Sequence, residues 1–305
     1  MYYTQLETSI GAIARIKTFS ETVKPEDQEG EDIVPPEEWP PRGEILLKGV
    51  LAAYGTDNSG NEPAFALKNI ELSVSPGEKV AICGRTGSGK SSLIALILKL
   101  LDTSDRTRDA VYIDNLALRH LDRQTLRRRI IAVPQDVVFL PDGATYQANL
   151  DPFDVATRQE CQFVLETVDL WAFVLECGGL DAGLIAGTLS HGQQQLFSLA
   201  RAVLRRRIRS RSVGLGGGGS EGGILLLDEV SSSVDRETEK AMREVIRAEF
   251  KEYTIMAVSH RLDMVMDFDR VVVMEKGEIV EAGRPSELAH EAGSRFGELW
   301  NLGAK

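Results

Sequence analysis

The chain has 305 residues, 43% of them hydrophobic, so it is long enough to bury one large core or two small ones. Asp and Glu number 46 against 35 Lys and Arg, and the resulting net charge of −11 argues against a protein that binds nucleic acid through an overall basic surface. Three cysteines far apart in the chain, without a C-x-x-C spacing, favour a reducing compartment over a disulfide framework or a zinc site.

The first part of the chain is expected to precede the main domain. Apolar residues recur at helical spacing over residues 1–19, which predicts a helix there. Residues 21–44 are acidic and proline-rich, a composition that buries no core and predicts an extended linker. We therefore expect a tail over residues 1–42 and a globular domain over residues 43–305. No stretch approaches the ~18–20 apolar residues of a membrane-spanning helix, and no signal peptide is expected.

Short apolar stretches bounded by turn residues predict the strands of the domain. They are EILLKGVLAAY (44–54), IELSV (70–74), KVAIC (79–83), AVYID (110–114), RIIAVP (129–134), ILLLDE (224–229), TIMAVSH (254–260) and RVVVMEKGEIVEAG (270–283), the last with a hairpin turn at Lys276-Gly277. Helical patterns separate most of them. The order predicts an α/β fold with a mixed, mainly parallel sheet flanked by helices, and an antiparallel β portion at the N-terminal side.

Two compositional features are not part of this pattern. The segment RSVGLGGGGSEGG (211–223) predicts a flexible loop, and both a natural insertion and an engineered linker fit its composition. Arginines cluster at residues 127–129 and 205–211. We expect these clusters to be solvated helix faces rather than a phosphate-binding surface.

A phosphate-binding loop is indicated by GRTGSGKSS (84–92), which fits the pattern G-x-x-x-x-G-K-[ST]. An apolar strand precedes the loop, and the helical stretch SLIALILKLL (92–101) follows it, so the positive end of a helix faces the anion. Backbone N–H groups would surround the β-phosphate, Lys90 would reach the β and γ oxygens, and Ser91 would hold Mg²⁺. The phosphate-binding residues are Gly84, Arg85, Thr86, Gly87, Ser88, Gly89, Lys90, Ser91 and Ser92.

Two acids end the predicted strand 224–229, which fits the second half of such a site. Asp228 is expected to support the Mg²⁺ shell, and Glu229 to act on the attacking water as general base. Both acids are needed in one place because phosphoryl transfer depends mostly on positioning and charge stabilisation.

The segment LSHGQQQLFSLARAVL (189–204) resembles the L-S-G-G-Q signature of the ATP-binding cassette (ABC) ATPases. In that family the signature opens a helix and binds the γ-phosphate of ATP held by the opposite subunit. The resemblance implies this role for Ser190, Gly192 and Gln193. His191 stands where the family has its first glycine, which bears on the tightness of the contact rather than on its role.

Further motifs of the family follow in the expected order. VPQD resembles the Q-loop and implies that Gln135 lies near Mg²⁺ and the water, while SSSVD (231–235) resembles the D-loop. VSHRL resembles the switch loop and implies that His260 reaches the γ-phosphate. The aromatic residue that stacks on adenine is expected at Tyr54.

The chain is most similar to the second nucleotide-binding domain of multidrug-resistance-associated (C-subfamily) exporters of fungal type, on GEKVAICGRTGSGKSSL and LRRRIIAVPQDVVFLPDGATYQANLDPF. This implies a helical signature subdomain over about residues 136–207. LETSIGAIARIKTF and PPEEWPPRGEI resemble the tail between the last transmembrane helix and that domain. The chain would then be a piece of a longer transporter, on the cytoplasmic side of its membrane.

The resemblance implies a domain that binds Mg·ATP, closes face to face with a second such domain, hydrolyses ATP and drives export through transmembrane domains absent from this chain. The second domain would be the N-terminal cassette of the same polypeptide or another copy of this chain, and no nucleic acid is expected. A regulatory module that signals by dimer closure with little turnover is the alternative, and the presence of Glu229 and His260 speaks against it. An ABC ATPase acting on ribosomes or DNA is disfavoured by the acidic charge.

Overall fold

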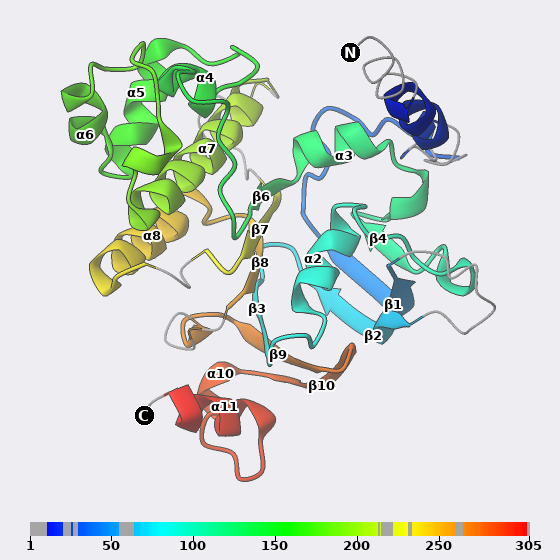
Figure 1. Cartoon of the computed structure of the whole chain (residues 1–305). Helices are drawn as coiled ribbons and strands as arrows, with labels where there is room; N and C mark the ends of the chain where they lie inside the picture. Colours follow the sequence, from blue (N-terminus) through cyan, green and yellow to red (C-terminus); the bar gives the residue numbers. More distant parts are fainter. Residues whose placement is uncertain are drawn as a thin grey trace.

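The computed structural model describes residues 11–20, 26, 30–54, 64–212, 214, 222–230, 234–259, 261 and 265–303 (Figure 1). Its strands are β1 (Ile45–Ala53), β2 (Phe65–Val74), β3 (Lys79–Gly84), β4 (Val111–Ile113), β5 (Leu116–Ala117), β6 (Ile131–Val133), β7 (Ile224–Asp228), β8 (Thr254–Val258), β9 (Arg270–Glu275) and β10 (Glu278–Gly283). Its longer helices are α2 (Lys90–Ile97), α3 (Arg123–Arg129), α4 (Tyr146–Leu150), α5 (Arg158–Thr167), α6 (Trp171–Glu176), α7 (His191–Ser212), α8 (Arg236–Glu249), α10 (Pro285–Leu288) and α11 (Arg295–Gly303). Short 3₁₀ helices span Asp105–Thr107, Leu118–His120 and Ala186–Thr188.

The strands form two sheets, as the sequence predicts. The antiparallel sheet has the order β2-β1-β4-β5, and the larger sheet has the order β10-β9-β3-β8-β7-β6. In the larger sheet β6, β7, β8, β3 and β9 are parallel, while β10 returns antiparallel to β9. The predicted α/β class is therefore confirmed, and so is the hairpin turn, where Lys276 and Gly277 both have positive φ, 51° and 85°.

The larger sheet lies between two apolar cores. Side chains of a strand alternate between its faces, so on β7 Leu225 and Leu227 point to one core, and Ile224 and Leu226 point to the other. The first core also contains side chains of α4 to α8. The helices themselves lie together on one side of the molecule (Figure 1). The second contains α2, α3 and the antiparallel sheet. Both faces of β7 are buried, which explains its unbroken apolar run.

The helix after the phosphate loop differs from the prediction, because it begins at Lys90 and ends at Ile97 rather than spanning residues 92–101. Lys99 adopts φ 51°, which a continuing helix does not allow. The Lys99 N–H donates to the Leu96 carbonyl at 3.0 Å, and the Leu100 N–H donates to the Ala95 carbonyl at 2.8 Å. These two bonds are a Schellman C-cap, with lysine in the position usually taken by glycine.

The segment before the domain packs on it, so the prediction that residues 21–44 bury nothing is wrong for part of that range. Trp39 is 3% exposed within the second core, and its indole N–H donates to the Ile113 carbonyl at 3.3 Å. Glu31 forms buried ion pairs of 2.8 Å with both Lys99 and Arg123. The division at residue 43 stays a prediction, but these contacts fasten the preceding segment to the end of α2 and the start of α3.

The arginine clusters are solvated only in part, because several of their side chains bind backbone carbonyls. Arg205 donates to the carbonyls of Arg127, Arg128 and Ile130 at 2.8 to 3.2 Å, so it satisfies the open C-terminal end of α3. Arg209 donates to the Glu38 and Pro40 carbonyls at 3.0 and 2.9 Å. The amino-acid composition of the clusters could not predict these hydrogen bonds, because the accepting carbonyls are distant in sequence.

The glycine-rich tract 211–223 is structured at both ends. Arg211 and Ser212 belong to α7, and a Cβ added to Gly222 would lie 1.8 Å from the Pro41 carbonyl oxygen. Residues 213 and 215–221 lie outside the described residues. Close packing against the backbone therefore explains one glycine of the tract.

Residues 11–20 are helical, as predicted, and their side chains are exposed, while residues 1–10 lie outside the described part. Ile13, Ile16 and Phe19 are each more than 60% exposed. Among the described residues, no helix combines the length and apolar character that crossing a bilayer demands.

Candidate functional site

The predicted site residues converge on the carboxyl edge of the parallel strands. Gly84 ends β3, Asp228 ends β7, and Gln135 follows β6 by two residues. In the sheet order β3-β8-β7-β6 these ends lie along one edge, where open α/β sheets bind ligands.

The phosphate loop is a turn whose shape depends on glycine. Gly84, Gly87 and Gly89 have φ values of 147°, 80° and 101°, in the region where side chains are strained. A Cβ on Gly84 would lie 2.3 Å from the Met274 carbonyl oxygen, and a Cβ on Gly89 would lie 2.9 Å from the Ala66 carbonyl oxygen. Arg85, Thr86 and Gly87 are exposed at the rim of the loop, and Ser88 is buried. The loop is thus held closely between β9 and β2.

The β9–β10 hairpin supports the loop in a way that sequence reasoning missed. The Gly277 N–H donates to the Ser88 carbonyl at 2.9 Å, and the Gly277 carbonyl accepts from the Lys68 N–H at 2.7 Å. The Lys276-Gly277 turn is visible in the sequence, but its contact with a loop almost 190 residues earlier is not.

Lys90 folds over the loop. It is 4% exposed, and its ammonium donates to the carbonyls of Gly84 and Arg85 at 3.0 and 3.2 Å. Burial lowers the pKa of Lys90, and the negative charge of Glu229 opposes that shift by favouring the ammonium form. An ammonium has three donors, so one remains for a phosphate oxygen.

Ser91 and Asp228 are adjacent, as a shared metal requires. The Ser91 hydroxyl donates to the Asp228 carboxylate at 3.2 Å. Burial raises the pKa of Asp228, while the Ser91 hydrogen bond opposes the shift. A hydroxyl and a carboxylate are oxygen ligands of the kind Mg²⁺ takes, usually with only one or two carboxylates. The two side chains therefore fit the predicted Mg²⁺ site.

Glu229 is held in an uncommon backbone conformation next to Asp228. Its φ is 50°, and its N–H donates to the Val258 carbonyl at the end of β8 at 3.0 Å. A non-glycine residue in this region costs free energy, and such residues gather at functional sites. The geometry turns the chain abruptly after β7, directly at the acid predicted to act as base.

Two further predicted residues flank the loop. Tyr54 is 63% exposed and its hydroxyl donates to the Ser92 hydroxyl at 3.2 Å, which places an open aromatic ring beside the start of α2. The Gln135 side chain is exposed, while its backbone carbonyl accepts a hydrogen bond of 2.7 Å from Gln195 on α7.

The signature residues form the start of α7. The Ser190 hydroxyl accepts from the Gln193 N–H at 3.2 Å, and the Gln193 side chain accepts from the Ser190 N–H at 2.8 Å. This reciprocal pair is a capping box, so both side chains have a structural role as well as the predicted one. A Cβ added to Gly192 would have Thr238 of α8 as its nearest neighbour among the described residues, at 3.5 Å.

The remaining predicted motifs are described in part. Residues 231–233 and His260 lie outside the described residues. The Asp235 carboxylate caps α8 by accepting from the N–H groups of Glu237 and Thr238 at 3.0 and 2.9 Å. The Arg261 guanidinium donates to the Val234 carbonyl at 2.8 Å and so links the segment after His260 to the predicted D-loop.

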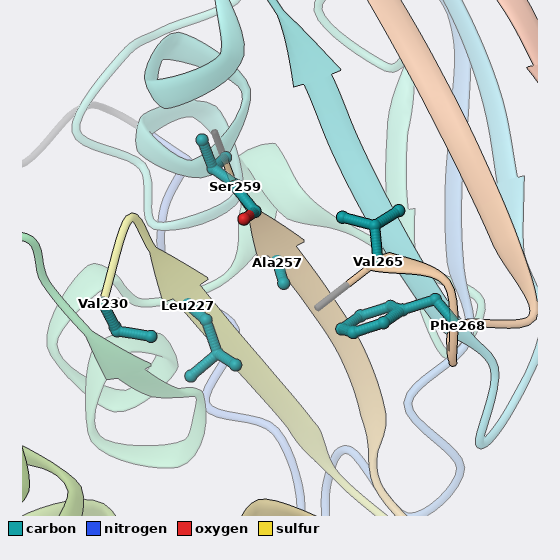
Figure 2. Close-up of a pocket in the computed structure, with 7 residues that line it drawn as sticks. Leu227, Val230, Ala257, Ser259, Val265 and Phe268 are labelled. Carbon is teal, nitrogen blue, oxygen red and sulfur yellow. The ribbon is translucent and has the colours of Figure 1, made fainter. Parts of the chain in front are cut away.

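A small pocket close to these residues is apolar. Figure 2 shows it beside the carboxyl ends of β7 and β8, with Leu227, Ala257 and Phe268 among its lining side chains. Among the described residues that line it, Ser259 alone has a polar side chain, and that hydroxyl bonds to the Arg261 backbone. None of the described residues that line the pocket carries a positive charge.

Comparison with other proteins shows what the chain is similar to. Residues 67–208 match the family model of the ABC transporter. The ABC-type transporter braE of Annulohypoxylon truncatum is 64% identical to this chain in an alignment that covers 99% of the chain. The ABC transporter FGM5 of Gibberella zeae is 49% identical in an alignment that covers the whole chain. The chain spans only about a fifth of these relatives, 22% and 21% of their lengths.

A solved structure shares the fold. It is a bacterial Atm1-family ABC exporter with ATP bound, at TM-score 0.78 and 23% identity, with all of this chain covered and 49% of the exporter. The family match covers the phosphate loop, the Gln135 segment and the signature. The chain therefore carries an ABC transporter nucleotide-binding domain, an ATP-binding domain homologous to the corresponding part of fungal ABC-type transporters.

Proposed function

We propose that this domain hydrolyses Mg·ATP in a composite site formed with a second nucleotide-binding domain, and that the hydrolysis drives export. The observation that carries the proposal concerns Gly192. Its φ is not among the positive values, and its own chain leaves room for a Cβ at an ordinary contact distance of 3.5 Å. Among the described residues nothing crowds this position, so the start of α7 is open to a group that approaches from outside, which we identify as the γ-phosphate of ATP held by the partner.

Within the site, each residue has one task in phosphoryl transfer. Lys90 and the N–H groups of residues 84–91 bind the phosphates, and Tyr54 stacks on the adenine. Ser91, Asp228 and Gln135 would hold Mg²⁺, which would offset the negative charge of the phosphates. Glu229 orients the water and accepts its proton.

His260 contacts the γ-phosphate in this proposal. Ser190, Gly192 and Gln193 act on the ATP of the partner, because the N–H groups at the start of α7 are positioned to bind an anion.

The partners follow from the resemblance to C-subfamily exporters. We propose that the chain is the second, C-terminal cassette of such an exporter, that its tail leads from a transmembrane domain, and that it works on the cytoplasmic side. The names of the relatives, which call them transporters, support the export part. Helix 11–20, with its exposed apolar side chains, supports a connection to further structure.

The test is ATP turnover by the chain as a function of its concentration. A composite site predicts that activity rises faster than linearly with protein concentration, with dimers detected by light scattering when Mg·ATP is added. Constant specific activity in a protein that remains monomeric would contradict the composite site. ATP-induced dimers without turnover would favour the regulatory alternative.

A further inference from the structure

Three consecutive glutamines at the start of α7 have three different partners. Gln193 closes the capping box with Ser190. Gln194 donates to the carbonyls of Ala186 and Leu189 at 3.2 and 3.3 Å, on the segment that leads into the helix. Gln195 alone of the three reaches across to the loop after β6, where it donates to the Gln135 carbonyl at 2.7 Å.

The environment of Gln195 is unusual for a neutral amide. The residue is 3% exposed, and its side-chain oxygen is buried without a hydrogen-bond partner among the described residues. The amide cannot turn round to relieve this, because the Gln135 carbonyl accepts only and must face the nitrogen. A buried acceptor left unpaired is costly, and Gln195 retains this cost while its nitrogen donates to the Gln135 carbonyl.

A second side chain of α7 holds the same loop. Arg201 donates to the Val138 carbonyl at 2.6 Å and to the Asn149 carbonyl at 2.7 Å. Its guanidinium lies 5.0 and 5.1 Å from the rings of Phe139 and Phe197. Gln195 therefore fixes the loop to α7 at residue 135, and Arg201 fixes it at residue 138. Of the two, the Gln195 bond is the one made to the predicted site residue Gln135.

We propose that Gln195 is a positioning residue that couples Gln135 to the signature of the same chain. The inference rests on the proposed function. Gln195 lies one helical turn beyond His191, the first residue of α7. When the γ-phosphate of the partner docks at the start of α7, displacement of the helix carries the Gln135 carbonyl with it. The Gln135 side chain then moves toward the Ser91–Asp228 pair, so docking at one ATP completes the Mg²⁺ site at the other.

The test compares Gln195→Met with Gln194→Met. Both substitutions remove one glutamine amide from the same helix and keep an unbranched side chain of similar length. For Gln195→Met we expect kcat to fall about tenfold, because small displacements of a positioned group have large effects on rate. The KM for ATP stays within about twofold, since the phosphate loop is untouched, and the Mg²⁺ concentration for half-maximal rate rises several-fold. The matched control Gln194→Met keeps the Mg²⁺ dependence of the parent.

The outcomes separate this inference from the proposed function. If the parent turns over Mg·ATP but Gln195→Met matches Gln194→Met in kcat and Mg²⁺ dependence, Gln195 has no positioning role and the inference fails alone. If the parent shows no turnover at any concentration, the proposed function fails. A loss of kcat and Tm together, with unchanged Mg²⁺ dependence, identifies a purely structural role and also overturns the inference. Should Gln195→Met not fold, Gln195→Asn, whose amide is one methylene too short, is judged by the same criteria.

Discussion

The phosphate loop and the signature both contain glycine, but the chain itself explains only the glycines of the loop. Gly84 and Gly89 have positive φ, and an added Cβ would lie 2.3 and 2.9 Å from backbone oxygens of neighbouring strands. Gly192 has neither restriction, and its nearest neighbour would be Thr238 at 3.5 Å. Folding within one chain therefore requires the first two glycines, whereas the third is left free for an outside group.

The polar side chains show the same difference. Lys90 and Ser91 contact groups of the loop and of β7, so the binding half of the site is assembled within one chain. Ser190 and Gln193 bond to each other at the start of α7. The difference is that the side chains proposed to bind phosphate and metal are held by contacts within one chain, whereas the ligand proposed for the signature belongs to a partner.

The largest expected effect separates catalysis of ATP hydrolysis from binding of ATP at the phosphate loop. Glu229→Gln keeps the shape of the side chain but cannot accept the proton, so we expect kcat to fall by about 10²- to 10⁴-fold. ATP affinity, measured by calorimetry, stays near that of the parent, and closed dimers accumulate with ATP. The exposed Glu252 provides the control substitution Glu252→Gln. Turnover by Glu229→Gln within twofold of the parent would remove Glu229 from the role of base.

The next effect tests whether the phosphate loop contributes directly to the binding of ATP. Lys90→Ala removes charge-assisted hydrogen bonds worth about 1.5 to 3 kcal/mol, so ATP affinity falls by about 10- to 150-fold. The control Lys68→Ala changes an exposed lysine on β2 and leaves affinity at the parent value. Equal calorimetric affinities for parent and Lys90→Ala would show that Lys90 does not contact the phosphates.

The smallest effect concerns the glycines themselves. Gly84→Ala is expected to lower the free energy of unfolding by about 1 to 3 kcal/mol or more, because of its strained φ and backbone overlap. Gly192→Ala is expected to change it by less than about 0.5 kcal/mol, and still to slow turnover several-fold by obstructing the partner's phosphate. Denaturant unfolding and ATPase rates measure the two quantities. Destabilisation by Gly192→Ala as large as that by Gly84→Ala would erase the difference between the two regions.

Much of the fold could be predicted because its signals are local. The apolar run before the phosphate loop and the run ending in Asp228 each predict a strand, and both strands are present. The shorter α2 was missed because lysine seldom adopts the left-handed conformation of Lys99, which here depends on Schellman bonds and on Glu31. Burial of Trp39 was missed because the acidic, proline-rich composition of the segment predicts a linker, and the residues that bury Trp39 are distant in sequence.

The candidate site divides in the same way. The sequence motifs predict that Lys90, Ser91 and Asp228 belong to one site, and the structure brings all three together. The support of Ser88 by Gly277 and of Gln135 by Gln195 depends on tertiary contacts that no spacing encodes. The roles of the predicted residues, His260 among them, stay predictions.

Mixing two inactive variants tests completion of one chain by another most directly. Ser190→Arg places a cation at the start of α7 but keeps its own phosphate loop, while Lys90→Ala weakens the loop but keeps the signature. Thermal unfolding checks that Ser190→Arg is folded, since loss of the capping box costs about 1 kcal/mol. Each variant alone is expected to be inactive, and mixtures at concentrations where the parent dimerises are expected to regain ATP turnover as heterodimers form. Mixtures that stay as inactive as either folded variant, at every ratio, would contradict a signature that acts on the partner's ATP.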